Sequence, residues 1–388
     1  MFSARTRFPL AVNRLARAAD AKRRGGAAVL DLTESNPTRG GLPYPPDLLA
    51  PLGQPAGLVY EPTPFGLASA RAAVATDYAR RGHIVTDDRV VLTASSSEAY
   101  GYLFKLLADP GDAVLVPRPG YPLFDYLAAL ESVEARPYPL AYDGEWHIDL
   151  AALAAAVTPR TRAVVLVNPG NPTGSFVKRQ EAETLHALCA GRGLALVSDE
   201  VFADYAWADD PRRFSSFAED GAALAFSLGG LSKSCGLPQL KLGWIAVSGP
   251  EALRRDALQR LELVADTYLS VATPVQVAAP ALLGRCDLLQ APLRERLRTN
   301  REHLAASLGR GSPATLLASE GGWYAVLQVP ATLTEEERVL RLLEERNVLV
   351  HPGYFFDFPN EAYLVLSLLP RPAVFEAAVA GIIDSLVL

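Results

Sequence analysis

The sequence has few cysteines and no long apolar run. Its 388 residues include three cysteines, Cys189, Cys235 and Cys286, which form neither a CxxC pair nor a cluster with other metal-ligating residues. This usage is typical of a reducing compartment, so we expect no structural disulfide and no metal site. No apolar stretch reaches the length of a membrane-spanning helix, and we expect no membrane contact.

An excess of charge of one sign is also lacking. The formal net charge is −6, from 37 Lys+Arg and 43 Asp+Glu. A nucleic-acid-binding protein would present a basic domain, so we expect no nucleic-acid partner. The first seven residues are basic but are not followed by the apolar core of a secretory signal. We therefore expect a cytoplasmic protein.

Apolar strands alternate with helices through the middle of the chain. Strands are predicted over residues 90–93, 113–116, 133–138, 163–167, 194–198, 222–228 and 243–247. Helices are predicted over residues 97–108, 122–131, 150–157, 180–192, 251–266 and 275–308, the last with an interruption. Near-continuous apolar strands between helices predict an α/β fold with a mostly parallel central sheet that is covered on both faces.

The C-terminal part has a different pattern. Predicted strands at 322–329, 348–350 and 363–367 surround a helix at 334–346, and a last helix covers 373–386. This predicts a smaller α+β unit, which the N-terminal segment joins. The chain is longer than a single core usually supports. We expect a large domain over residues 46–280 and a small domain formed by residues 1–45 together with 281–388.

One lysine follows a predicted buried strand. Lys233 lies in the run Gly229-Gly230-Leu231-Ser232-Lys233-Ser234, directly after the apolar residues 222–228. A lysine at such a place is costly unless it is paired or reacting. A lysine that forms a Schiff base needs a partly desolvated, fixed amine. This stretch alone leaves a reactive lysine and an ordinary loop lysine equally open.

Three serines open the helix predicted after the strand at 90–93. In a parallel α/β sheet, ligands bind outside the carboxyl ends of the strands. Ser95, Ser96 and Ser97 offer backbone N–H groups and hydroxyls to an anion, with the helix dipole behind them. The alternative is a simple N-cap with Glu98 in the first turn. A cap needs only one serine, so we favour an anion site.

An amide and a carboxylate follow two further strands. Asn171 lies in a turn after residues 163–167, and Asp199 follows residues 194–198, where a buried carboxylate demands a cationic partner. With the serines and Lys233, these residues place an anion cradle, an amide, a carboxylate and an amine at one sheet edge. A pyridoxal phosphate enzyme needs these parts, because its carboxylate keeps the pyridine nitrogen protonated and the ring acts as an electron sink.

The chain resembles the class I/II aminotransferases of the fold-type I pyridoxal phosphate family over nearly its whole length. The matching motifs are Asn171-Pro172-Thr173-Gly174, Asp199-Glu200-Val201-Phe202 and Ser232-Lys233, and the lysine motif is closest to alanine-type members. The resemblance implies pyridoxal 5′-phosphate as the cofactor and transamination between an amino acid and a 2-oxo acid.

The resemblance also implies a role for each matching residue. Lys233 would be the Schiff-base lysine and proton shuttle, Asp199 the partner of the pyridine nitrogen, and Asn171 the contact of the ring oxygen and the substrate carboxylate. The other implied cofactor-binding residues are Ser96, Ser97, Tyr121, Ser232, Lys241 and Tyr60. Tyr121 would stack on the ring. Tyr60 would reach the phosphate of the neighbouring subunit, which implies a homodimer with shared active sites.

Three cofactor-site positions depart from the family pattern. The arginine that usually holds the phosphate is replaced by Lys241, which keeps the charge but loses the fork geometry. Gly230 stands where a serine is frequent, as in alanine-type members. Phe202 stands where a tyrosine usually contacts the ring oxygen, which would leave Asn171 to hold that oxygen.

The substrate site departs more strongly. Val365 stands where the family has the arginine for the substrate carboxylate. Arg39 and Arg371 are the alternative candidates for that contact, although surface positions are the more ordinary interpretation of both. Tyr268 falls about where the neighbouring subunit's arginine for acidic side chains would be. We therefore expect neutral or aromatic amino acids as donors.

The missing arginine at Val365 leaves a second function open. A transaminase normally needs a firm hold on the substrate carboxylate, so the alternative is a pyridoxal phosphate-dependent lyase, decarboxylase or oxidase on the same fold. A catalytically silent relative is disfavoured by the intact Lys233, Asp199 and Asn171. A nicotinamide enzyme is excluded because no predicted strand is followed by G-x-G-x-x-G.

Overall fold

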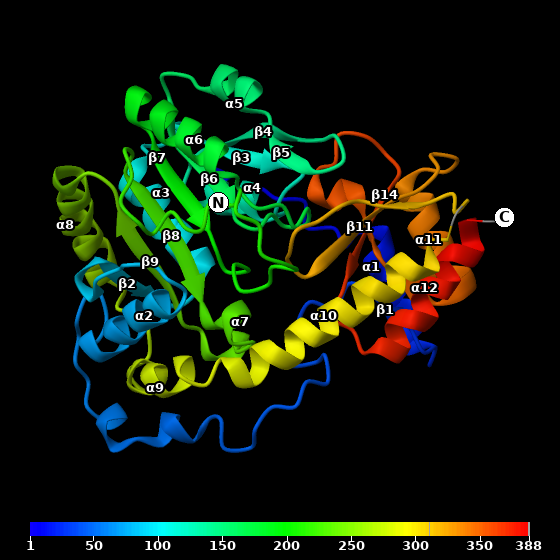
Figure 1. Cartoon of the computed structure of the whole chain (residues 1–388), viewed down its shortest axis with the longest axis horizontal. Coiled ribbons are helices and arrows are strands. Elements are labelled where there is room, and N and C mark those ends of the chain that lie inside the picture. Colours follow the sequence, from blue (N-terminus) through cyan, green and yellow to red (C-terminus); the bar gives the residue numbers. More distant parts are fainter. Residues whose placement is uncertain (310, 387–388) are drawn as a thin grey trace.

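A computed structural model describes residues 1–309 and 311–386. A large sheet with helices on both sides lies next to a smaller unit, and the long helix α10 (Asp287–Ser307) runs between the two (Figure 1). No helix within these described ranges is long and apolar enough to cross a membrane. The same ranges contain no group of three or more metal-ligating side chains placed to hold a metal ion.

The large sheet has eight strands. They are β2 (Val90–Thr93), β3 (Ala113–Arg118), β4 (Glu134–Tyr142), β5 (Trp146–Ile148), β6 (Thr161–Val167), β7 (Ala195–Asp199), β8 (Ala225–Gly230) and β9 (Gly243–Ser248), in the order β2-β9-β8-β7-β6-β3-β4-β5. The pairings from β4 to β8 are parallel. The edge strand β5 is antiparallel to β4, and β9 is antiparallel to both of its neighbours. The predicted α/β class with a mostly parallel sheet is confirmed.

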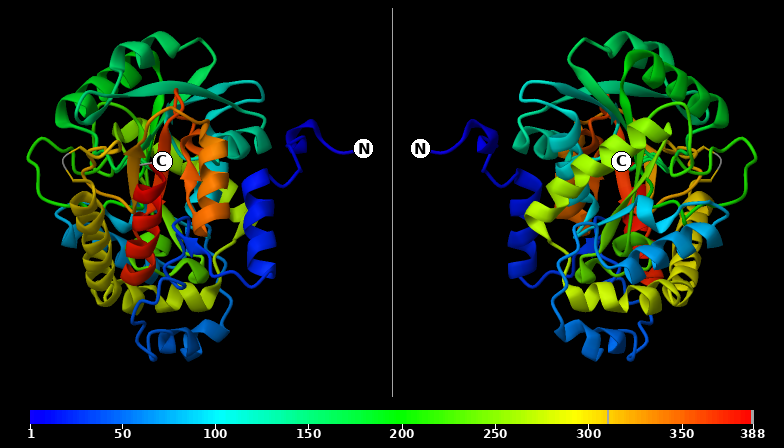
Figure 2. Two further views of the ribbon diagram at one scale, coloured as in Figure 1. Left: turned by 90° about the vertical axis from the view of Figure 1, so that its right-hand side faces the viewer. Right: turned by 90° about the vertical axis from the view of Figure 1, so that its left-hand side faces the viewer.

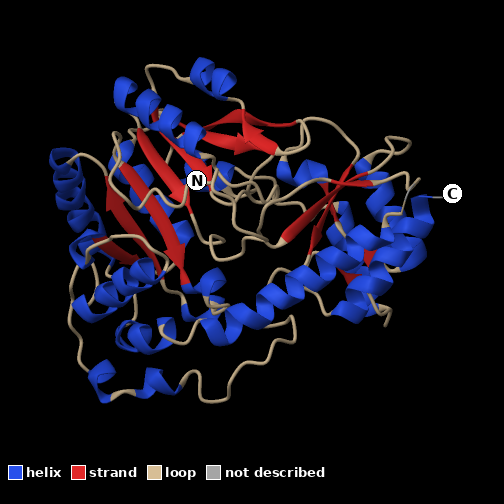
Figure 3. Ribbon diagram, viewed as in Figure 1, coloured by secondary structure: helices blue, strands red, loops and turns tan. Residues whose placement is uncertain are grey.

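Helices cover both faces of this sheet (Figure 3). They are α2 (Ala68–Arg80), α3 (Ser96–Leu107), α4 (Phe124–Leu130), α5 (Leu150–Ala156), α6 (Arg179–Arg192), α7 (Leu231–Ser234), α8 (Glu251–Tyr268) and α9 (Thr273–Leu283). Successive residues of a strand face opposite layers. Accordingly Val165 packs with α3 and α8, whereas Val164 and Leu166 pack with α5 and α6. The near-continuous apolar strands of the sequence follow from this double cover.

The smaller unit combines both ends of the chain. Its antiparallel sheet has the order β10 (Thr315–Leu316), β11 (Tyr324–Gln328), β14 (Tyr363–Ser367) and β13 (His351–Pro352), and β1 (Leu30–Asp31) pairs in parallel with β12 (Val348–Leu349). Its helices are α1 (Arg14–Arg24), α11 (Glu335–Arg346) and α12 (Pro372–Leu386). The predicted α+β unit of N- and C-terminal segments is therefore confirmed, while the domain limits at 45/46 and 280/281 stay a prediction.

Short 3₁₀ helices occupy the connecting segments. They are η1 (Ala4–Thr6), η2 (Ala50–Gly53), η3 (Pro55–Leu58), η4 (Asp87–Arg89), η5 (Pro238–Leu240) and η6 (Gly353–Phe356). The first residues of the chain project from the body of the molecule (Figure 2). In the small unit, η6 contacts the loop that follows β3 of the large sheet. Gly120 in that loop donates its N–H to the carbonyl of Phe356 at 2.9 Å.

The expectation of no structural disulfide is wrong for one pair. Cys235 and Cys286 are disulfide-bonded, with 4.5 Å between their Cα atoms, whereas Cys189 is free and buried. The two partners are 51 residues apart, so only the fold brings them together. Cys235 follows α7 and Cys286 precedes α10. The bond therefore connects the short helix that carries Lys233 to the start of the helix between the two units.

Candidate active site

The strand register brings the polar groups to one edge of the large sheet. Thr93 at the end of β2 pairs with Gly243, and Gly243 pairs with Gly230 at the end of β8. Asp199 at the end of β7 pairs with Val167 at the end of β6. The serines, Lys233, Asp199 and Asn171 follow these same ends, so the sequence-predicted cluster is assembled at the carboxyl edge where α/β sheets bind ligands.

Lys233 lies in the short helix α7, directly after β8. Its Nζ is 4.8 Å from the ring centroid of Trp323 and 5.6 Å from that of Phe202. Burial lowers the pKa of this amine to about 8, although the Asp199 carboxylate acts in the opposite direction. The Tyr205 hydroxyl donates to the Lys233 carbonyl at 2.6 Å and fixes the backbone. An amine that is largely desolvated and held in place suits a nucleophile and proton carrier.

Asp199 is a buried carboxylate that is stabilised both by hydrogen bonds and by a nearby cation. Burial raises its pKa to about 6, while hydrogen bonds from Val201 N–H at 3.2 Å and from the Tyr100 hydroxyl at 3.1 Å lower the pKa, as does the Lys233 amine. The cationic partner expected from the sequence is therefore Lys233. With a pKa of about 6 the carboxylate is mostly ionised at neutral pH.

Glu200, the next residue, is satisfied in a different way. Its side chain is 4% exposed. The carboxylate accepts hydrogen bonds from the hydroxyls of Ser198 at 3.0 Å, Ser216 at 2.6 Å and Ser227 at 3.2 Å, and from the Phe217 N–H at 2.9 Å. Neutral donors can stabilise a buried charge without an ion pair. Glu200 therefore holds strand ends together through neutral donors, and the Arg81 guanidinium is the cation that acts on it electrostatically.

The serine cluster divides into a cap and two open hydroxyls. Ser95 is the N-cap of α3, and its Oγ accepts from the Glu98 N–H at 3.2 Å. Ser96 and Ser97 begin the helix, and neither hydroxyl makes a hydrogen bond within the described ranges. Gly243 lies against this turn, since a Cβ added there would be 3.1 Å from the Ser95 carbonyl carbon. The simple cap explains Ser95, while the N–H groups and hydroxyls of the next two residues remain available to an anion.

Two buried amide atoms at the end of β6 lack partners. The Asn168 Oδ1 accepts from the Val177 N–H at 3.0 Å, but its Nδ2 has no partner among the described residues, and neither has Oδ1 of Asn171. Buried polar atoms are rarely left unpaired. Tyr121 lies close enough to Asp199 and Tyr324 for both to act on its hydroxyl. Burial, followed by Asp199 and then Tyr324, raises the pKa of Tyr121 to about 12. These groups leave polar atoms for a bound molecule to satisfy.

Three predicted cofactor residues make no side-chain hydrogen bond or ion pair with this cluster within the described ranges. Lys241 is exposed and has a left-handed backbone, with φ of 51°. Tyr60 is 71% exposed and lines a cavity with Ser270 and Tyr102 rather than with Lys233. Ser232 lies in α7 beside Lys233, and its hydroxyl makes no hydrogen bond within the described residues.

The substrate-carboxylate position is apolar. Val365 is fully buried in a cluster with Trp146 and Phe356. Of the alternative arginines, Arg39 is exposed, and the guanidinium of Arg371 lies against Gly41, where an added Cβ would be 2.3 Å from Nε. Neither arginine makes a hydrogen bond to Lys233, Asp199 or Asn171 within the described residues. The structure thus gives no support to either arginine as the carboxylate contact.

Three residues that contact the site were not found from the sequence. Tyr100, Trp323 and Tyr205 contact Asp199 or Lys233, yet each reads as an ordinary apolar residue of a helix, strand or loop. The family resemblance also places His351 near the pocket, although a structural histidine is the more ordinary interpretation. His351 pairs directly with Val365 across β13 and β14, and burial lowers its pKa to about 4. Its buried Nδ1 has no hydrogen-bond partner among the described residues.

Comparison with known proteins decides the family. Residues 57–372 match the family model described as aminotransferase class I and II. The chain belongs to this family. It is 34% identical over 307 residues to the S-alkyl-thiohydroximate lyase SUR1 of Arabidopsis thaliana, covering 76% of this chain and 66% of that protein, slightly under two thirds of its length.

Two further relatives cover most of this aminotransferase-family chain. It is 27% identical over 355 residues to the glutamate-pyruvate aminotransferase AlaA of Escherichia coli K12, covering 89% of this chain and 87% of that protein. A solved alanine aminotransferase from Pyrococcus furiosus superposes with a TM-score of 0.89 over 100% of this chain and 99% of that one. At 23% identity that structure shows the fold alone. The expected family, fold and pyridoxal phosphate-dependent aminotransferase activity are confirmed.

The residues present fit pyridoxal 5′-phosphate. The unpaired Asn171 Oδ1, the open serine turn of α3 and the adjacent amine and carboxylate offer the polar contacts that a phosphorylated pyridine requires. This fit rests on atoms that otherwise lack partners.

Proposed function

We propose that Lys233, Asp199 and Asn171 are the catalytic residues of a transaminase that takes neutral or aromatic amino acids and 2-oxo acids as substrates. The observation that carries this proposal is the buried Lys233 amine, whose pKa of about 8 lies near neutrality beside the Asp199 carboxylate. Catalytic groups work best with a pKa near the working pH.

The family motifs and the shared sheet edge support a set of cofactor contacts. Ser96, Ser97, Ser232 and Lys241 would hold the phosphate, Tyr121 would stack on the ring, Asn171 would contact the ring oxygen and Asp199 the pyridine nitrogen. When bound, the cofactor supplies an electron sink for the negative charge that develops at the substrate Cα. Asp199 would serve this chemistry, because an ionised carboxylate beside the pyridine nitrogen would keep that nitrogen protonated.

Lys233 moves the proton of the substrate. Its neutral amine takes the proton from Cα of the amino donor, and the same group returns a proton when the 2-oxo acid is the substrate. Trp323 and Phe202 lie beside Nζ and exclude water from it. Tyr205 holds the backbone of Lys233, so the amine stays in one position through both half-reactions.

The remaining proposals concern assembly and location. We propose a homodimer in which Tyr60 of each chain completes the phosphate site of the other, because Tyr60 is exposed and separate from its own cluster. We also propose a cytoplasmic location. Both are supported by the membership of the aminotransferase family and by the motif around Tyr60.

A panel of amino donors tests the substrate class. The protein loaded with cofactor is mixed with one amino acid at a time, and the yellow absorbance is followed without and then with a 2-oxo acid. We expect alanine or aromatic donors to bleach the colour and the oxo acid to restore it, because Val365 and Tyr268 stand where acid-selecting or carboxylate-binding arginines would be. Efficient bleaching by aspartate and glutamate alone would contradict this substrate class.

A carbon–sulfur lyase is the second candidate function. Two observations favour it: the apolar Val365 at the carboxylate position, and the 34% identity to a protein named as an S-alkyl-thiohydroximate lyase. The same panel distinguishes the two, since a lyase keeps its colour while pyruvate and ammonia accumulate from a cysteine conjugate. A decarboxylase would keep its colour while carbon dioxide accumulates, and an oxidase would consume oxygen.

A further inference from the structure

A second cavity lies between α10 and the loop that follows β7. Its volume is about 260 Å³, and we call it the α10 cavity. The loop contributes Tyr205, Ala206 and Trp207, and α10 contributes Arg294, Arg298, Arg301 and Glu302. None of the proposed cofactor or catalytic residues lines it. The helix crosses from the large sheet to the small unit in Figure 1, so the α10 cavity lies at the junction of the two.

Three arginines of α10 face this cavity. Their spacing of four and then three residues places Arg294, Arg298 and Arg301 on one face of the helix. Arg298 forms an ion pair with Glu295. Arg294 donates to neutral acceptors, the Asp204 carbonyl at 2.9 Å and the Gln290 Oε1 at 3.1 Å. Positive charge therefore outweighs the single acidic side chain among the lining residues.

Arg301 is the residue that most needs a partner. Its guanidinium carbon lies 5.5 Å from the centroid of the Trp207 ring, and its buried Nε makes no hydrogen bond to any described residue. Arg301 forms no ion pair within residues 1–309 and 311–386. Burial lowers its pKa, while the Glu302 carboxylate acts in the opposite direction. A half-buried guanidinium with no carboxylate in ion-pair contact is costly, and an anion beside it would reduce that cost.

We propose that the α10 cavity binds a small organic anion with a carboxylate or phosphate group, held by Arg301 and Arg298, with Trp207 against its apolar part. Guanidinium groups bind such anions through paired N–H donors. The volume corresponds to roughly nine water molecules, so an inorganic ion would fill only part of the space. The combination of an indole ring and arginines therefore fits an organic anion.

The anion would bind apart from the amino-transfer site, although one wall residue contacts the catalytic segment. Tyr205 forms part of the cavity wall, while its hydroxyl donates to the carbonyl of Lys233 at 2.6 Å. The cavity thus contacts the catalytic segment through its backbone, on a side that none of the site residues lines. Binding there requires no turnover, so a titration tests the α10 cavity independently of the proposed transaminase activity.

Calorimetric titration of the cofactor-loaded protein tests the proposal. The probes are phenyl phosphate, benzoate and inorganic phosphate, with phenol as the uncharged counterpart. We expect one saturable site per chain for phenyl phosphate or benzoate, a much weaker response to inorganic phosphate, and none to phenol. A stronger response to phenyl phosphate than to benzoate assigns a phosphate ligand, and the reverse assigns a carboxylate. Binding should also change the tryptophan fluorescence, and Trp207→Phe should remove that change.

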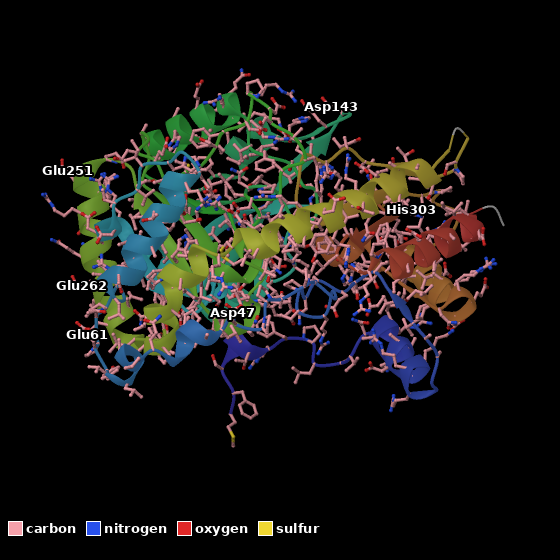
Figure 4. All side chains as sticks on the ribbon, turned by 60° about the horizontal axis from the view of Figure 1, so that its bottom comes forward. Asp47, Glu61, Asp143, Glu251, Glu262 and His303 are labelled. Atoms are coloured by element: carbon pink, nitrogen blue, oxygen red, sulfur yellow. A yellow bond between two sulfur atoms is a disulfide. The ribbon has the colours of Figure 1, made fainter. Side chains whose placement is uncertain are left out.

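Matched variants locate the binding. Arg301→Gln should weaken the binding of the anion probe at least tenfold. Arg298 is exposed, so Arg298→Gln should leave the fold intact and weaken binding several-fold. Arg260→Gln is the control, since Arg260 is exposed and lies on α8, away from the cavity. Figure 4 shows this separation: Glu251 and Glu262 of α8 lie on the opposite side of the molecule from His303 of α10. Absence of binding for both organic anions, or equal affinity in wild type, Arg301→Gln and Arg298→Gln, would overturn the proposal.

Discussion

The hydroxyl of Tyr100 donates a hydrogen bond of 3.1 Å to Oδ2 of Asp199 and so links α3 to the end of β7. Both side chains are buried. Because α3 also begins with Ser96 and Ser97, one helix carries the turn that we propose binds the phosphate and positions the carboxylate. The distance between these two parts is therefore set by rigid structure, which a site for one fixed ligand requires.

Tyr100→Phe should weaken catalysis most at low pH. The Tyr100 hydrogen bond lowers the pKa of Asp199, which burial raises to about 6. Loss of a hydrogen bond to a charged group costs about 1.5–3 kcal/mol, so the pKa should rise by roughly one to two units. Activity that needs ionised Asp199 would then be lost at a higher pH, which a pH profile of kcat/KM measures.

Tyr102→Phe is the control for this variant. Its hydroxyl is on the same helix but hydrogen-bonds to Ser270, at 3.4 Å, and to no other residue within the described ranges. The acid limb of its pH profile should match that of the wild type. An unshifted acid limb in Tyr100→Phe would show that the hydrogen bond does not tune Asp199.

Lys233→Met should stabilise the protein that lacks cofactor at neutral pH. The Lys233 pKa is about 8 in the folded chain and 10.5 in its ordinary state. Between these values the unfolded chain binds more protons, so the free energy of unfolding of the wild type rises with pH. The difference corresponds to about 3 kcal/mol. Urea denaturation at pH 7 and pH 10 should show the advantage of Lys233→Met shrinking as the pH rises, and a constant advantage would contradict the depressed pKa.

Lys241 should contribute to cofactor affinity through its charge. Lys241→Asn keeps a side chain that tolerates the left-handed backbone at φ 51°, so the fold should be unaffected. Losing one charged contact should weaken cofactor binding by about 1.4 kcal/mol, or tenfold. Lys241→Arg should bind at least as tightly as the wild type, because a guanidinium matches a phosphate with two donors. Equal dissociation constants for Lys241→Asn and the wild type would remove Lys241 from the phosphate site.

Val365→Arg should destabilise the protein and not improve substrate binding. Val365 is fully buried beside Trp146 and Phe356. An arginine there would be a buried charge without a partner, which costs about 3–5 kcal/mol. Thermal unfolding checks the stability, and Val365→Leu is the apolar control. An unchanged melting temperature together with a lower KM for the amino donor would show that this chain can still use a guanidinium at that position.

Much of the fold could be predicted because burial leaves a strong pattern. The strand predicted at 363–367 coincides with β14, and the helix predicted at 180–192 begins one residue later than α6. The direction of β9 could not be predicted, since a strand covered on both faces is apolar whether it runs parallel or antiparallel. The helix predicted at 275–308 with interruptions near Asp287 and Pro292 is two helices, α9 and α10, which divide just before Asp287 as predicted, whereas Pro292 lies inside α10 without ending it.

The candidate site was predictable where chemistry interrupts an apolar pattern. Lys233 and Asp199 were visible because charged residues at the ends of buried strands are unusual. Tyr100 and Trp323 could not be found this way, because an aromatic residue within a helix or before a strand is common in any core. The Cys235–Cys286 bond was missed for a different reason. The two cysteines are 51 residues apart in the sequence, and only the fold brings them together.

The covalent attachment of the cofactor tests the central claim most directly. The chain has five lysines, Lys22, Lys105, Lys178, Lys233 and Lys241. Reduction of the yellow protein with borohydride, followed by digestion and mass spectrometry, identifies the lysine that carries the cofactor. We predict a single adduct on Lys233, and no adduct after prior bleaching with a neutral amino donor. An adduct on another lysine, or none in protein saturated with pyridoxal 5′-phosphate, would contradict the assignment of Lys233.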